Sequence, residues 1–160
     1  MLTIRATKKL LDRCGGPSSN EPSTTRLGDW YATVLFWRPQ VVLFVNEQTR
    51  CPVFAPFAPI TQVVPRFIDA FGKIATQLGV ALTALDAECA LMNDHAWAKT
   101  ASRSVVGSMN DFAFLADHAR QQEGVDLVAL SLRLARTPCG PLRAGAGHPD
   151  RALLSALGAR

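Results

Sequence analysis

The chain has 160 residues, 48% of them hydrophobic, which suits one domain with a core of its own. Its 17 lysines and arginines and 13 acidic residues give a formal net charge of +4, which permits an anionic partner without requiring one. No apolar run is long enough for a membrane span or a secretory signal, so we expect a cytoplasmic protein that does not bind membranes.

The first predicted elements are a short strand and a short helix. Apolar residues alternate with polar ones over 2–6, as in a strand with one exposed face. Thr7 is placed to cap a helix over 8–14, which the glycine pair at 15–16 would end. The polar stretch over 15–26 predicts a flexible surface loop.

Three strands are predicted next, over 30–37, 41–46 and 51–57, because these runs are rich in aromatic and β-branched residues. Their short connections favour an antiparallel meander. Pro52 and Pro56 cannot donate to a neighbouring strand, so the third strand should lie at an edge or end early.

Helical spacing of apolar residues predicts a helix over 61–78, with Pro65 in its first turn and Gly79 at its end. A shorter helix should follow around 83–92. Alternation over 95–100 then predicts one more strand.

Two further helices are predicted, over 104–122 and over 126–136, the second capped by Asp126. We expect the single domain to comprise residues 1–141. The tail over 142–160 is weakly patterned and predicted to be weakly structured; its last ten residues form either a short amphipathic helix or a frayed end.

Strands followed by helices, rather than strict alternation, predict the α+β class. We expect a mostly antiparallel sheet of four to five strands, made of the meander over 30–57 with 2–6 and 95–100. Three or more helices should cover it on one face.

The cysteines and histidines show no spacing typical of a metal site or a disulfide framework. They are Cys14, Cys51, Cys89 and Cys139, and His95, His118 and His148. We therefore expect reduced, mostly buried thiols and neither a metal site nor a cofactor.

The segment 97–114, WAKTASRSVVGSMNDFAF, sets polar side chains among aromatic ones and has two interpretations. In the structural one, Ser102 or Ser104 caps a helix, the polar groups form a buried hydrogen-bond network, and Asn110 and Asp111 face solvent. Its weakness is that several early positions are poor helix formers.

In the functional interpretation, the helix start binds an anion. Free backbone donors and a partial positive charge attract anions there, and Lys99 and Arg103 would complete a phosphate or carboxylate cradle. Gly107 would let a ligand approach and Asn110 would orient it. The assigned residues are Lys99, Thr100, Arg103, Ser104, Gly107, Asn110 and Asp111. Against this interpretation, Asp111 adds negative charge and no phosphate-binding loop motif is present.

Three blocks, IRATKKLL, LGDWYATVLFWRPQVVLFVNEQTRCPVF and KTASRSVVGSMNDFAFLA, resemble a family of small bacterial proteins known only as a domain of unknown function. The resemblance covers most of residues 2–136 and implies no activity. It adds five positions of the meander to the candidate site: Gly28, Trp30, Arg38, Asn46 and Thr49.

The two parts of the site could meet. If the strand over 95–100 joins the meander, Arg38 and Arg50 would lie near the helix start. Trp30 and its aromatic neighbours could then stack on bases, as in single-strand binders. The alternative is that these rings fill the covered face of the sheet.

Three functions remain open. We favour a non-catalytic binding module for an anionic partner, either nucleic acid or an acidic protein surface. The second is a hydrolase or phosphoryl-transfer enzyme with Arg103 at the site and Asp111, Asp94 or His95 as base, although no nucleophile and base pair is visible. The third is a structural or assembly protein. The ligand and the oligomeric state are not determined by the sequence.

Overall fold

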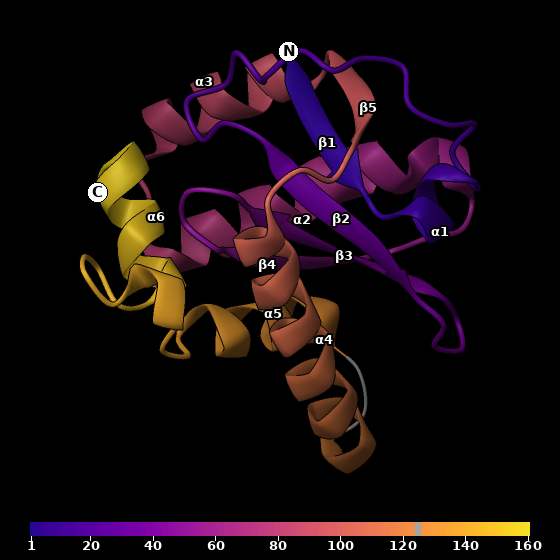
Figure 1. The fold of residues 1–160 in the computed structure, drawn as a ribbon. Helices are drawn as coiled ribbons and strands as arrows, with labels where there is room; N and C mark the ends of the chain where they lie inside the picture. Colours follow the sequence, from indigo (N-terminus) through magenta and orange to yellow (C-terminus); the bar gives the residue numbers. More distant parts are fainter. Residues whose placement is uncertain (124–125) are drawn as a thin grey trace.

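The computed structural model describes residues 1–123 and 126–160, and in them one mixed sheet is packed between helices (Figure 1). The strands are β1 (Leu2–Ala6), β2 (Trp30–Leu35), β3 (Val41–Asn46), β4 (Pro52–Pro56) and β5 (His95–Lys99). The helices are α1 (Lys8–Leu11), α2 (Val63–Leu78), α3 (Leu82–Met92), α4 (Arg103–Glu123), α5 (Leu127–Ala135) and α6 (Pro149–Leu157), with 3-10 turns at Ile60–Gln62 and Gly140–Leu142. The predicted α+β class is confirmed.

The strands are ordered β4-β3-β2-β1-β5. β2, β3 and β4 form the predicted antiparallel meander. β1 is parallel to both of its neighbours, and Ile4 lies opposite Trp30 on one side and Trp97 on the other. Parallel neighbours need a connection that returns the chain to the same end of the sheet, and between β1 and β2 this is α1 with the loop that follows it.

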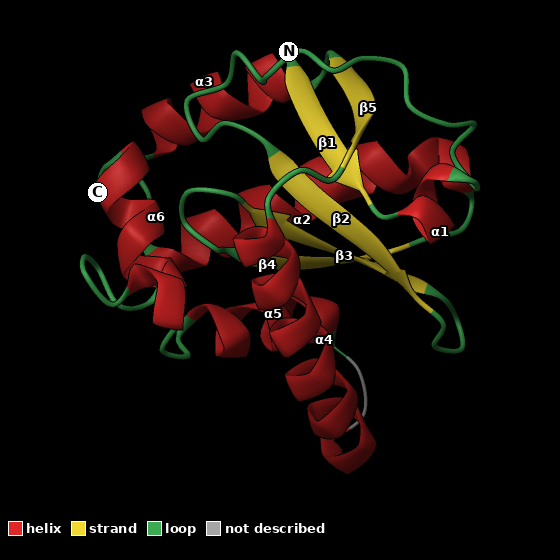
Figure 2. Cartoon of the chain, in the orientation of Figure 1, coloured by secondary structure: helices red, strands yellow, loops and turns green. Residues whose placement is uncertain are grey.

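The sheet carries a hydrophobic core on each face. On one face Ile4, Trp30 and Phe44 pack with α2. On the other, Tyr31 and Leu43 pack with α4 and α5. Figure 2 shows α4 crossing the near face of the sheet and α2 behind it. The expectation that helices cover one face is therefore wrong: every residue of β2 and β3 is buried, as in strands covered on both sides.

β4 lies at an edge of the sheet, as its prolines indicate. Pro52 and Pro56 lie opposite Val45 and Val41, and their backbone nitrogens, which have no hydrogen to donate, are on the outer side of the strand, away from β3. The backbone N–H of Phe54 is on this outer side too and donates to Ser131 Oγ of α5 at 3.0 Å. The outer edge of this strand is thus covered by a helix rather than left open.

Thr7 and Asp126 were both assigned as helix caps from the sequence. Asp126 caps α5 as predicted, because its Oδ1 accepts from the N–H groups of Val128 and Ala129. Thr7 precedes α1 but caps it with no side-chain hydrogen bond; its hydroxyl lies 3.0 Å from that of Thr33 instead.

The loop over 15–26 contains no helix or strand and is hydrogen-bonded to the sheet. Thr3 Oγ1 donates to the Glu21 carbonyl at 2.7 Å, and the N–H of Ser18 donates to the Trp97 carbonyl at 2.8 Å. These contacts lay the loop along β1 and β5.

The last residues are more ordered than expected. Of the two outcomes left open for them, the structure has the helix, α6, which buries Leu153 and Leu157 in the core beside α2. The description of the tail as weakly structured is corrected accordingly.

Within the described ranges, no helix is both long enough and apolar enough to cross a membrane.

Candidate functional site

The start of α4 is attached to the sheet through Ser102. Its backbone N–H donates to Tyr31 Oη at 2.9 Å, and its hydroxyl accepts from the N–H of Val105 at 3.3 Å. Ser102 is therefore the cap, one of the two residues predicted for that role. The N–H groups of Arg103 and Ser104, two exposed residues, have no hydrogen-bond partner among the described residues.

Arg50 lies beneath the first two turns of α4. It follows β3 in the turn to β4, has a positive φ of 58°, and is only 9% exposed. Its Nε donates to Ser108 Oγ at 3.2 Å and its Nη2 to Ser104 Oγ at 3.0 Å. It forms no ion pair with any residue that the structure describes. Burial lowers the pKa of Arg50, as expected for a cation removed from water.

Cys139 completes this group, which we call the Arg50 cluster (Arg50, Ser104, Ser108 and Cys139). Burial raises the pKa of the Cys139 thiol, and this effect outweighs the hydrogen bond with Ser108 and the charge of Arg50, which lower it. The thiol is therefore protonated at neutral pH and is not an activated nucleophile.

The remaining residues of the predicted helix-start site surround this cluster. Lys99 and Arg103 are exposed, and neither side chain has a partner among the described residues; Thr100 beside them is half-buried. Gly107 is half-buried, and a Cβ atom added there would meet no atom within 4 Å. Asn110 and Asp111, one turn further, are exposed. The structure thus brings two cations and two free amides to one end of α4, together with the charge of Asp111, which raises the pKa of the Cys139 thiol.

Two residues predicted for the site lie in the interior instead. Trp30 is fully buried on the α2 face, with the rings of Phe67 and Phe71 at 4.9 and 5.3 Å. Asn46 is fully buried and uses its amide to hold the turn that follows it: Nδ2 donates to the Leu27 carbonyl and Oδ1 accepts from the Thr49 hydroxyl. Neither side chain presents a surface to a partner.

Arg38 is exposed but lies at the far end of the sheet. It borders a cavity of about 240 Å³ together with Trp37 and Arg120, near the other end of α4. The expectation that Arg38 lies near the helix start is therefore wrong, whereas for Arg50 it is right. Tyr31 and Trp37 are 2% and 8% exposed, so neither ring is free for stacking on bases. The exposed ring in this part of the chain is Phe36, and Lys9 Nζ lies 5.3 Å from its centroid.

Two of the three residues considered as a catalytic base, Asp94 and His95, lie away from the helix start, whereas Asp111 lies on α4 itself. Asp94 and His95 stand at the beginning of β5 and Lys99 at its end. Because a strand rises about 3.3 Å per residue, His95 lies roughly 13 Å from Lys99 along the strand. This arrangement gives Arg103 no neighbouring base from β5.

A buried ion pair that sequence reasoning missed holds the loop beside this site. Arg5 Nε lies 2.6 Å from Asp29 Oδ2, with side chains 12% and 6% exposed. Asp29 Oδ1 also accepts from the N–H of Ser23, and Arg5 Nη1 donates to the Lys99 carbonyl. The available signal was an arginine at one of the two polar positions of a short, otherwise uncharged strand.

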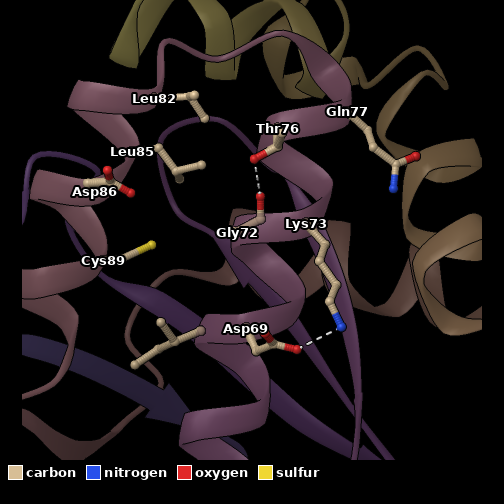
Figure 3. A pocket seen from close by; sticks show the side chains of 10 residues that line it. Asp69, Gly72, Lys73, Thr76, Gln77, Leu82, Leu85, Asp86 and Cys89 are labelled. Atoms are coloured by element: carbon tan, nitrogen blue, oxygen red, sulfur yellow. Dashed lines mark hydrogen bonds and ion pairs between the residues drawn. The ribbon is translucent and has the colours of Figure 1, made fainter.

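A larger cavity, of about 450 Å³, lies between α2 and α3 (Figure 3). Its polar rim has charges of both signs: Lys73 pairs with Asp69 at 2.9 Å on α2, and Asp86 lines the same cavity from α3. This rim does not favour an anion, so we place the candidate site at the start of α4.

Comparisons with known proteins support the resemblance seen in the sequence. Residues 3–152 match the family described as a domain of unknown function (DUF6933). The match extends past Pro141 into α6, beyond the blocks that carried the resemblance. No curated protein and no solved structure matches the chain at a significant level.

Proposed function

The chain belongs to the DUF6933 family, a domain of unknown function, and we propose that it is a non-catalytic binding module for an anionic partner, which it contacts at the start of α4. The partner is a nucleic acid or an acidic protein surface. We place this activity in the bacterial cytoplasm.

The observation that carries the proposal is the buried charge of Arg50, which forms no ion pair within the part of the chain that the structure describes. Burying a guanidinium is costly unless an opposite charge accompanies it. Arg50 donates to two serine hydroxyls, and the charge of Glu47 raises its pKa by less than burial lowers it. Its Nη1 makes no hydrogen bond with any described residue. An anion seated over Ser104 would supply the missing negative charge.

The surface around Arg50 supports the same conclusion. Lys99 and Arg103 add two exposed positive charges, and the free N–H groups at the helix start add directed donors. Arg103 thus extends into solvent and is not consumed by an internal network. Because Trp30, Tyr31 and Trp37 are buried, contacts to a nucleic acid at this site would be made with phosphates rather than by base stacking.

Two variants of equal charge test the proposal. Lys99→Ala/Arg103→Ala removes the cations at the helix start, and Lys9→Ala/Arg160→Ala removes an exposed lysine and an exposed arginine elsewhere. Binding of fluorescent single- and double-stranded DNA and RNA and of a polyglutamate peptide is followed by anisotropy. We expect binding that falls steeply with added salt, and a loss of about tenfold or more in the first variant only.

The melting temperature serves as the second readout. Since neither Lys99 nor Arg103 has a side-chain partner within residues 1–123 and 126–160, the first variant should unfold at the wild-type temperature. No binding to any of these probes at low ionic strength, or the same loss in both variants, contradicts the proposal. A large loss of stability without any binding would favour the alternative, a structural protein whose polar stretch is a buried network.

A further inference from the structure

A separate cavity lies on the α2 face of the sheet, beside edge strand β5. It has a volume of about 290 Å³ and is bounded by β5, the residues after α1 and the start of α2. Val63 and Val64 form part of its apolar wall, and Trp97 lines it while packing against the same core. Trp97 belongs to the aromatic-rich segment noted in the sequence but takes no part in the helix-start site.

The polar side chains that line this cavity are hydrogen-bond donors. The imidazole of His95, Nε1 of Trp97 and the hydroxyl of Thr61 have no hydrogen-bond partner among the described residues. Arg13 has a single side-chain hydrogen bond, a long one of 3.4 Å to Gln40, and its guanidinium lies 4.7 Å from the ring centroid of Phe57. No carboxylate is among the lining residues that the structure describes. Such a lining favours an anion over a cation or a neutral polar molecule.

The aromatic walls are held in a defined arrangement. His95 and Trp97 occupy the same face of β5, with ring centroids 6.5 Å apart and planes at 89°. The backbone of Trp97 is fixed at the open edge of the strand by Ser18, whose N–H donates to its carbonyl and whose hydroxyl accepts from its N–H. The Trp97 indole is therefore held in place as a flat apolar surface against which one planar ring can pack.

We propose that this cavity binds a small aromatic anion, a single ring that carries a carboxylate or a phosphate. The ring packs on Trp97 and the apolar wall, and the anionic group faces Arg13 and His95. The cavity volume limits the ligand to a single ring, because ligand pockets of about 300 Å³ are at the small end of the usual range. The site is independent of the helix-start site, which lies on the opposite face of the sheet.

Four probes test the contributions of the aromatic ring and of the negative charge to binding. Benzoate and phenyl phosphate have both features, benzyl alcohol has only the ring, and inorganic phosphate has only the charge. Binding to the full chain is followed by two-dimensional NMR, with the Trp97 indole signal assigned by its absence in Trp97→Phe. We expect benzoate or phenyl phosphate to shift this signal and to bind at least about tenfold more tightly than either single-feature probe. The preferred anionic group follows from which of the two binds better.

Arg13→Gln should weaken binding of the aromatic anion about tenfold, whereas Arg160→Gln, which removes an exposed arginine elsewhere, should leave it unchanged. Both are surface substitutions, and an unchanged melting temperature verifies the fold. His95→Ala, a second exposed position, repeats the test. The proposal is overturned if about 10 mM of either aromatic anion leaves the Trp97 signal in place, if benzyl alcohol or inorganic phosphate binds equally well, or if Arg13→Gln binds like the wild type.

Discussion

Arg50 and Ser104 stand 54 positions apart in the sequence, and Nη2 of Arg50 donates to Ser104 Oγ at 3.0 Å. The bond joins the turn between β3 and β4 to the first turn of α4. A second bond, to Ser108, continues along the same side of the helix. One buried side chain thus sets the position of the helix start and places a positive charge beneath it.

The positive φ of Arg50 allows the contribution of its side-chain hydrogen bonds to be measured apart from the strain of its backbone. Its φ of 58° is unfavourable for any residue with a Cβ atom and suits glycine. Arg50→Ala loses the hydrogen bonds and keeps the strain, whereas Arg50→Gly loses the bonds and relieves it. We expect the glycine variant to be more stable than the alanine variant by about 1 kcal/mol in urea unfolding, and both to lose anion binding. Equal stability of the two would show that this backbone conformation carries no strain.

The pair of Asp29 and Arg5 should contribute far more to stability than a surface pair. Removing one partner leaves the other charge buried, so Asp29→Ala should lower the free energy of unfolding by about 3–5 kcal/mol. Asp69→Ala is the matched control, because Asp69 pairs with Lys73 in a pair 67% and 61% exposed and should lose less than about 1 kcal/mol. Similar losses from the two substitutions would contradict the assigned burial.

Gly107 offers a change in which stability and binding should diverge. The site sits inside a helix, and an added Cβ atom would meet nothing within 4 Å. Gly107→Ala should therefore raise the free energy of unfolding by about 1 kcal/mol. If the partner approaches this turn closely, the same variant binds it less well. Gly28→Ala is the opposing control, since φ is 74° there and its Cβ would lie 2.7 Å from Glu47 Oε1; it should destabilise the fold.

Stability should decline in alkaline solution because of Cys51. Burial raises the pKa of its thiol from the ordinary 9.0 to about 12. Above pH 9 the thiol ionises in the unfolded chain but not in the folded one, so its contribution is complete below pH 9 and is lost as the pH rises toward 12. The slope attributable to Cys51 should approach 1.4 kcal/mol per pH unit, roughly one bound proton.

Cys51→Ala isolates this slope from the titration of other groups. Urea unfolding at several pH values between about pH 8 and 11 should show that the free energy of unfolding falls less steeply with pH in the variant. The cavity left by the substitution lowers the free energy of unfolding at every pH and does not change this slope. Parallel curves for the two proteins would mean that the thiol ionises equally in both states. Cys14 and Cys89, with pKa values raised to about 11 by burial, act in the same direction.

The elements that the sequence predicted well are those whose pattern is local. The meander followed from dense β-branched and aromatic runs with short connections, and the start of α5 from the Asp126 cap. The second core was missed although its signal was present, because continuous apolar runs in β2 and β3 indicate burial on both faces. α6 was ambiguous because a short amphipathic segment becomes a stable helix only when something covers its apolar side, here the core beside α2.

The sequence by itself determined the class of the fold, the two candidates for the cap of α4, and the segment between the end of β5 and the first turn of α4 that carries the exposed cations. Only the tertiary structure decided which of the other predicted residues join it: Arg50 does, while Trp30, Asn46 and Arg38 do not. The physical reason is that a side chain's accessibility and partners depend on which face and which end of the sheet it occupies. Those are set by the parallel pairing of β1 and by packing on both faces, and no local pattern encodes them.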